Sequence, residues 1–225
     1  PGGGVRSNPA SARIPRVAGL SRRNARAKHR RFLVEGPQGV REAVRHAPGR
    51  VLDVYLTEAA LERHSEIWDE AVAAGLYVHV TTQQVMDAMS PDAQGILAVV
   101  ATEETAGSEA LAAALEGARL VAVLTQAQDP GNAGAIIRAA DAAGADAVVL
   151  VRGSVDPTAP KVVRSTAGSL FHLPVVTGVA LDDAVTALHN AGLTVLAADG
   201  RGDFDLFEAE SLLEAPSAWL LGNEA

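Results

Sequence analysis

Two polar residues, Asn132 and Arg138, stand where a strand is expected to give way to a helix. They belong to the run TQAQDPGNAGAIIRAADAAGADAVVLV, which predicts a strand end, a turn rich in Pro, Gly and Asn, and then a helix. Helical spacing places Arg138 within two turns of the helix start, close to the loop. A guanidinium there can orient a phosphate and stabilise developing negative charge. Taken alone, the pair fits a capping asparagine and a surface arginine better.

Several other kinds of chemistry are excluded by what the chain lacks. The loop contains neither GxGxxG nor GxxxxGK[ST], so the fingerprints of dinucleotide and nucleoside triphosphate binding are absent. There is no cysteine, which removes disulfides, thiolate ligands and thiol nucleophiles. The six histidines are dispersed, without an HxH or HExxH pair, so no metal site is expected.

The elements around Asn132 and Arg138 predict an open, mostly parallel sheet. Apolar runs such as VAVL, AVVLV and TVLAA are continuous, as expected when helices cover both faces of a sheet. Ligands bind beyond the carboxyl ends of such strands, so the loops after Leu124, Val151, Ala198 and Leu221 are the places for a site. Strands are expected at 120–124, 147–151, 173–176, 194–198 and 218–221, and helices at 133–143, 160–169 and 181–191.

The first half of the chain predicts a second, smaller α/β domain. The polar run TEETAGS at 102–108 separates two series of strands, so we place a recognition domain at 13–103 and a larger domain at 108–225. Residues 1–12 lack an apolar period and are expected to be a disordered lead. The expected elements are a basic helix ending near Lys28, strands 31–34, 51–56, 77–80 and 96–101, and helices 39–46, 59–74 and 83–89.

Positive charge is concentrated at the N-terminus although the net charge is -8. Nine of the 19 cationic residues precede the first acidic residue, Glu35, and the remainder of the chain carries 10 cations against 27 carboxylates. This asymmetry fits phosphate binding by one region of an acidic protein, and it fits a merely solvated basic helix equally well. Apolar stretches long enough to cross a bilayer and a signal peptide are both absent, which favours a cytoplasmic protein.

Three ordered motifs resemble those of the SpoU (TrmH-like) methyltransferases of the SPOUT superfamily. Residues 129–138, DPGNAGAIIR, are similar to the family's first signature, N-x-G-x-x-x-R after a strand. Residues 161–169, KVVRSTAGS, are similar to its (K/R)-x-S-x-G segment, and 220–224, LLGNE, to its second signature. Residues 32–36, FLVEG, are similar to a strand of the family's ribosomal-protein-like recognition domain. The resemblance covers nearly the whole chain after residue 12.

The resemblance implies methylation of a ribose 2'-hydroxyl in structured RNA by a homodimer that uses S-adenosylmethionine. It implies catalytic roles for Arg138, Asn132 and Glu224. Arg138 would contact the RNA from the partner subunit, and because a guanidinium pKa lies above about 12, orienting phosphate and stabilising alkoxide is the economical role. Asn132 would fix the loop and Arg138, while Glu224 would bind substrate or balance the sulfonium. The implied cofactor-binding residues are Ala197, Ala198, Asp199, Gly200, Leu221, Gly222 and Asn223.

The family also implies a trefoil knot in the larger domain, closed by a third signature containing Ser-x-Asn. That knot-closing segment is absent here, because the sequence stops at Ala225. Two explanations remain open, a longer protein of which these residues are the ordered part, or a truncated and inactive form. The lack of an initiator methionine favours the first.

RNA recognition should depend on phosphates and folded shape, because aromatic residues make up only 4% of the chain. Ribosomal RNA is favoured over transfer RNA by the separate recognition domain, an argument by analogy. A catalytically silent RNA-binding protein of ribosome assembly and a transfer RNA 2'-O-methyltransferase are the alternatives; a dehydrogenase is disfavoured. The candidate RNA-binding residues are Arg22, Arg23, Lys28, Arg30, Arg31, Arg152, Lys161 and Arg164, each of which is also compatible with a solvated surface position.

Overall fold

The structure is a computed structural model that describes residues 12–197 and 214–222. The chain forms two compact units, one of residues 1–103 and 158–171, the other of residues 104–157 and 172–225. Within the described part, no helix is long and apolar enough to cross a membrane. The expected lead at 1–12 lies, apart from Ala12, outside the described residues.

The first unit is built on a mixed four-stranded sheet. Its order is β1 (Arg31–Glu35), β4 (Ile96–Ala101), β2 (Val51–Thr57) and β3 (Val78–Thr81). β4 is antiparallel to both of its neighbours, and β2 and β3 are parallel. All four strands match the expected segments to within one residue at each end.

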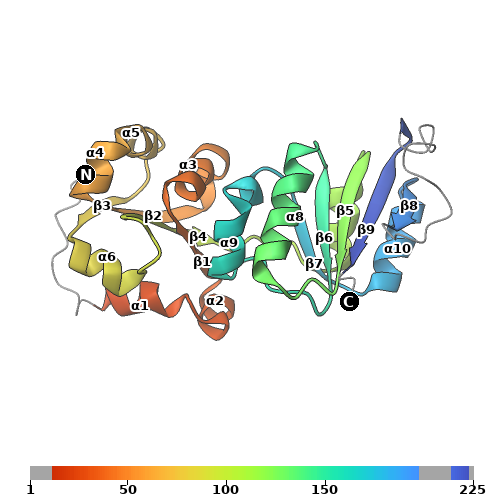
Figure 1. The fold of residues 1–225 in the computed structure, drawn as a ribbon, viewed down its shortest axis with the longest axis horizontal. Helices are drawn as coiled ribbons and strands as arrows, with labels where there is room; N and C mark the ends of the chain where they lie inside the picture. The colour runs from red at the N-terminus through yellow and green to blue at the C-terminus, as the bar shows by residue number, and fades with distance from the viewer. Residues whose placement is uncertain (1–11, 198–213, 223–225) are drawn as a thin grey trace. The chain divides into compact units, whose positions relative to one another are not determined.

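Helices cover both faces of this sheet (Figure 1). Side chains along β1 alternate between the two faces. Phe32 and Val34 belong to the core on one face, which is covered by α3 (Pro37–His46), α4 (Glu58–Arg63) and α5 (Ser65–Ala73). Leu33 belongs to the core on the opposite face, which is covered by α1 (Arg13–Gly19) and α6 (Gln83–Met89). The expected basic helix is two helices, α1 and α2 (Arg23–His29), and the expected helix 59–74 is broken at His64 into α4 and α5. A short 3-10 turn, η1 (Pro48–Arg50), precedes β2.

A segment from the second half of the sequence completes the first unit. It comprises α9 (Pro160–Thr166) and the 3-10 turn η2 (Ser169–Phe171). Val163 belongs to the core beneath α3, and the Phe171 ring stacks on Phe32 with centroids 6.3 Å apart. Between them, Gly168 has φ +93°, and a Cβ there would lie 2.4 Å from Cγ of Glu42, so only glycine fits. The expected helix 160–169 therefore ends early, at Thr166.

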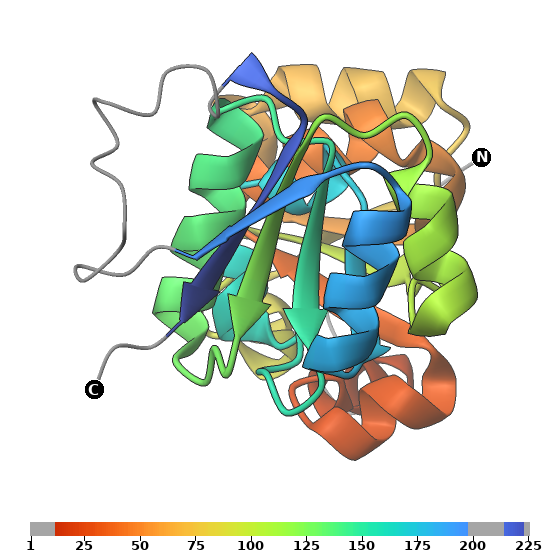
Figure 2. The same ribbon diagram turned by 90° about the vertical axis from the view of Figure 1, so that its right-hand side faces the viewer.

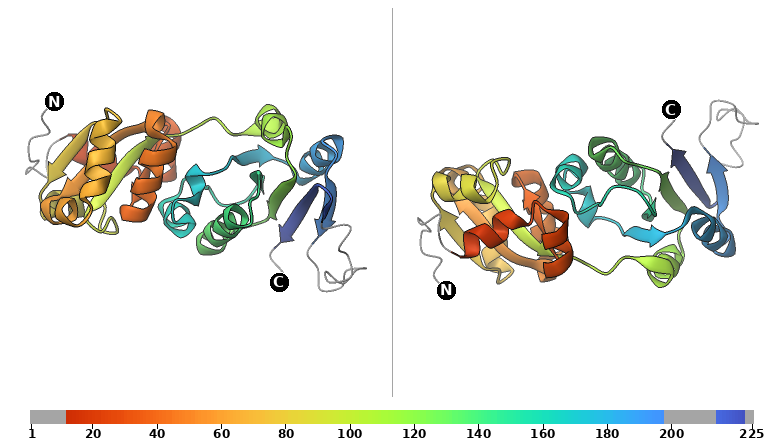
Figure 3. Two further views of the ribbon diagram at one scale, coloured as in Figure 1. Left: turned by 90° about the horizontal axis from the view of Figure 1, so that it is seen from above. Right: turned by 90° about the horizontal axis from the view of Figure 1, so that it is seen from below.

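The second unit contains a five-stranded sheet in which every pair is parallel, as expected. The order is β7 (Val175–Val179), β6 (Ala147–Val151), β5 (Leu120–Thr125), β9 (Ser217–Gly222) and β8 (Thr194–Ala197). α7 (Gly107–Leu115), which the sequence analysis missed, and α10 (Leu181–Asn190) cover one face. α8 (Pro130–Ala142) covers the other (Figures 2 and 3). The expected knot concerns chain beyond β9 and lies outside the described residues.

Candidate active site at the carboxyl edge of the second sheet

The strand order places a switch point between β5 and β9. From β5 the chain proceeds outward through β6 to β7, and then crosses to β8 on the far side and returns to β9. In open parallel sheets the crevice beyond the carboxyl ends of the strands at such a point accepts ligands, because the loops on its two sides diverge. At this point β5 ends at Thr125 and β9 ends at Gly222, and the two residues pair with each other.

Gly222 is packed closely against the side chain of Thr125. A Cβ at Gly222 would lie 3.0 Å from Oγ1 of Thr125, and that hydroxyl donates to the carbonyl oxygen of Leu221 at 3.4 Å. Gly222 itself has no side chain, and the end of β9 is held against β5. A flat group hydrogen-bonded to backbone needs such a surface, so this edge fits the adenosine part of a nucleoside cofactor.

The loop after β5 is fixed in a strained conformation. Gln126 has φ +55°, in the left-handed region that non-glycine residues rarely adopt. The carbonyl of Ala127 accepts from the backbone N–H of Val155 at 2.8 Å, and Nε2 of Gln128 donates to the carbonyl of Gly153 at 3.3 Å. These bonds tie the loop to the one after β6. The sequence analysis placed a site in the loop after Leu124 but singled out neither Thr125 nor Gln126.

α8 begins earlier than expected because of an Asp-Pro start. Asp129 is the N-cap: its carboxylate accepts from the backbone N–H of Asn132 at 3.0 Å, and Pro130 occupies the first helical position. Asn132 therefore lies in the first turn of α8, and its side chain is exposed. The sequence analysis placed Asn132 in the preceding turn and overlooked Asp129, although Asp followed by Pro is a recognisable helix start.

Arg138 is exposed on α8 and makes no hydrogen bond or ion pair within the described part of the chain. It lies about 9 Å along the helix axis from Asn132 and about a third of a turn around it, so the two side chains leave different faces of the helix. The nearest acidic residue along the helix, Asp141, is hydrogen-bonded to Nδ1 of His172 at 2.6 Å. The guanidinium is thus available for an external anion.

Three of the predicted cofactor-binding residues lie at strand ends. Ala197 ends β8, and Leu221 and Gly222 end β9, at the same edge of the sheet as the loop after β5. The other predicted cofactor residues, Ala198, Asp199, Gly200 and Asn223, and the predicted catalytic Glu224 lie outside the described residues.

The basic residues around α2 are exposed, with one exception. The exposed set is Arg22, Arg23, Lys28, Arg30 and Arg31. Arg26 is the exception: it is buried, and its Nη1 donates to the carbonyls of Leu20 and Ser21 at 3.2 and 2.9 Å, which satisfies the end of α1. One cation of this segment therefore serves folding, while its neighbours are accessible to phosphates.

The remaining candidates for RNA contact differ in environment. Arg152 is exposed directly after β6, and its Nη2 donates to the carbonyl of Gly178 at 3.2 Å. Lys161 is exposed on α9. Arg164 is half-buried: its Nη1 lies 2.7 Å from Oε1 of the buried Glu35 and 3.7 Å from Asp92. Its charge is neutralised inside the first unit, which supports a structural role.

The models of two protein families match the two halves of the chain. The model of the SpoU rRNA Methylase family matches residues 119–225, and that of the MRM3-like substrate binding domain matches residues 11–98. A 23S rRNA (uridine(2479)-2'-O)-methyltransferase from Streptomyces viridochromogenes is 33% identical over 219 residues, which are 91% of this chain and 72% of the relative.

The chain belongs to the SpoU methylase family. A second SpoU relative, the 23S rRNA (guanosine(2553)-2'-O)-methyltransferase RlmP of Bacillus subtilis, is 36% identical over 159 residues. That match spans 70% of this chain and 58% of RlmP.

Solved structures show the same SpoU fold. The methyltransferase AviRb from Streptomyces viridochromogenes in complex with AdoMet superimposes with a TM-score of 0.77 at 27% identity, covering 96% of this chain and 82% of AviRb. An rRNA methyltransferase from Sinorhizobium meliloti gives a TM-score of 0.80 at 24% identity, covering 99% of this chain and 83% of that one. The predicted family and α/β fold are therefore confirmed.

Proposed function

We propose that this protein methylates a ribose 2'-hydroxyl of ribosomal RNA with S-adenosylmethionine, in the cytoplasm. The observation that carries the proposal is a match over 91% of the chain to a relative whose name specifies 23S rRNA 2'-O-methylation. A solved relative that holds AdoMet and shares the fold over 96% of this chain supports the choice of cofactor. The basic surface around α2 supports RNA as the partner, because phosphate contacts dominate RNA affinity.

The strand ends would hold the cofactor. Leu221, Gly222 and Ala197 would bind its adenosine through backbone groups, together with Ala198, Asp199, Gly200 and Asn223. When bound, S-adenosylmethionine supplies a methyl group made electrophilic by the sulfonium. Arg138 would orient a phosphate of the RNA and stabilise the alkoxide developing on the 2'-oxygen. Asn132 would fix the loop before α8 and Arg138, and Glu224 would bind substrate or balance the sulfonium charge. Positioning of this kind supplies most of the acceleration in such displacements.

Cofactor binding should be sensitive to a side chain added at Gly222, the end of β9. We expect calorimetry to detect S-adenosylmethionine binding to the intact chain, and Gly222→Ala to weaken it about tenfold. The added methyl group would lie 3.0 Å from Oγ1 of Thr125 and displace the strand ends that adenosine would approach. Gly49→Ala is the control, since a Cβ there meets nothing within 4 Å. Equal affinities of the two variants for S-adenosylmethionine would show that Gly222 is not part of the cofactor site.

The enzyme should be a homodimer with α8 at its interface. Ala135, Ala139 and Ala142 are exposed along this helix, on the side that also carries Arg138, and small residues allow close helix packing. Light scattering at micromolar concentration should give twice the chain mass of 23.2 kDa. Ala139→Glu should shift the mass toward a single chain, whereas Ala113→Glu on α7 should not. A wild-type protein of single-chain mass would contradict the dimer and the shared site together.

A further inference from the structure

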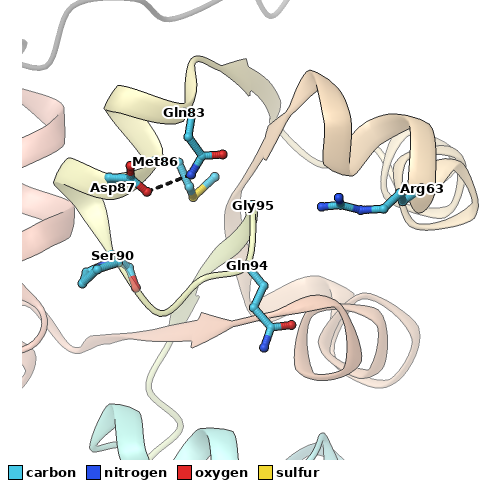
Figure 4. A pocket seen from close by; sticks show the side chains of 8 residues that line it. Arg63, Gln83, Met86, Asp87, Ser90, Gln94 and Gly95 are labelled. Carbon is cyan, nitrogen blue, oxygen red and sulfur yellow. Dashed lines mark hydrogen bonds between the residues drawn. The ribbon is translucent and has the colours of Figure 1, made fainter.

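A polar cavity of about 220 Å³ lies in the first unit, far along the sequence from the methyltransferase motifs. Its walls are the end of α4, the exposed side of α6 and the loop 90–95 (Figure 4). Six side chains give it its chemistry: Arg63, Gln83, Met86, Asp87, Ser90 and Gln94. None of them was singled out by the sequence analysis.

The loop that forms one wall is held in a fixed shape. Gln94 has φ +54° and Gly95 φ +80°, two consecutive left-handed residues. A Cβ at Gly95 would lie 2.9 Å from Oγ1 of Thr57, so the loop passes close over the end of β2. The carbonyl of Gly95 accepts from the backbone N–H of Thr57 at 2.9 Å, and the buried hydroxyl of Ser90 donates to the carboxylate of Glu35. A loop that two hydrogen bonds hold in a strained conformation is typical of a preformed binding site.

The cavity presents hydrogen-bonding groups that the described part of the protein does not itself use. Arg63 makes no hydrogen bond or ion pair with the described residues, and its guanidinium is directed toward the cavity, with Nη2 3.8 Å from the position of a Cβ on Gly95 (Figure 4). Nε2 of Gln83 donates to Asp87 at 2.8 Å, which orients that amide and leaves its oxygen as an acceptor. Met86, whose side chain is almost wholly buried, also lines the cavity.

We infer that this cavity binds one unpaired nucleobase of the RNA substrate. A base is flat, carries donors and acceptors on its edge, and stacks on a guanidinium plane. The volume is below the roughly 300 Å³ at which pockets for larger ligands begin, so a single ring system suits it. The base must be unpaired, because a paired base is stacked between its neighbours inside the helix and cannot enter a cavity. The inference rests on the proposed function, and it adds a second point of contact on the RNA, away from the methylated ribose.

Two matched pairs of variants test the cavity. The RNA is a 23S rRNA fragment that the wild-type protein binds. We measure its binding constant for Gln83→Ala beside the control Gln84→Ala, and for Arg63→Ala beside the control Arg45→Ala. Gln84 is the exposed neighbour of Gln83 on α6, and Arg45 is an exposed arginine of the same unit; neither lines the cavity. We expect each cavity variant to bind about tenfold more weakly than its control. Equal affinities within both pairs would overturn the inference.

An abasic scan identifies the nucleotide. Each unpaired nucleotide of the fragment is replaced in turn by an abasic one, and wild-type protein should lose about tenfold in affinity at one position. Gln83→Ala should be insensitive to that position and Gln84→Ala should keep the loss. Wild-type affinity that no abasic replacement lowers, or a loss that persists in Gln83→Ala, would contradict a base in the cavity. Absence of methyl transfer by wild-type protein would instead refute the proposed function, because these binding measurements do not need it.

Discussion

Arg138→Ala should lower methyl transfer at least about a hundredfold while the protein stays folded. The loss is that of one donor aimed at developing negative charge, which costs about a hundredfold to a thousandfold in other enzymes. Folding should be unaffected, because Arg138 is exposed and has no hydrogen bond or ion pair among the described residues. The measurement is the rate of methyl incorporation from S-adenosylmethionine into rRNA, with circular dichroism melting as the test of folding.

Two further variants test whether Arg138 acts through its positive charge alone. Arg138→Lys keeps the charge and loses the planar fork of donors, so its rate should stay far below wild type. Arg119→Ala removes an exposed arginine at the opposite, amino-terminal edge of the same sheet and should retain activity. Wild-type rates in both Arg138 variants would move catalysis to another residue.

Glu35→Ala should destabilise the first unit more than any surface substitution. The Glu35 side chain is 4% exposed, and it accepts from Arg164 at 2.7 Å and from the hydroxyl of Ser90. Its removal leaves a buried hydroxyl without an acceptor and a half-buried guanidinium with only Asp92, at 3.7 Å. Such losses cost about 2–3 kcal/mol. The unfolding transition of the first unit should therefore shift down by roughly 5–10 °C in calorimetry.

A surface pair provides the contrast. Glu103→Ala removes a carboxylate that is 62% exposed and pairs with Arg50 at 3.3 Å, and exposed pairs contribute less than about 1 kcal/mol. The double variant Glu35→Ala with Arg164→Met should regain part of the lost stability, because both charged partners are then gone. Equal melting of Glu35→Ala and Glu103→Ala would show that the buried cluster has no structural role.

Strand positions could be predicted because apolar runs report burial directly. β4 and β6 lie where the sequence placed them, since their residues are buried on both faces and no polar residue interrupts them. α7 was missed because only two leucines, Leu111 and Leu115, anchor an otherwise small-residue helix that follows a polar run. Its apolar period is correspondingly weak.

Long-range placement could not be predicted from local patterns. Nothing in the sequence of α9 indicates that Val163 packs with Phe32 and Val34 rather than with the strands that flank it in the chain. The Arg164–Glu35 pair joins residues 129 positions apart, and the left-handed Gln94 that shapes the cavity follows no turn motif. The site residues Asn132 and Arg138 were found by resemblance, because their spacing alone favours a capped surface helix.

Complete digestion of rRNA after incubation with the protein and methyl-labelled S-adenosylmethionine tests the central claim most directly. The nucleosides are separated and identified by mass spectrometry, with heat-inactivated protein as the blank. The account predicts that the label is found in a 2'-O-methyl nucleoside, that it arises from one nucleotide of the RNA, and that Arg138→Ala removes it. Label on a base, or no transfer by a protein that binds the cofactor in calorimetry, would contradict the proposed function.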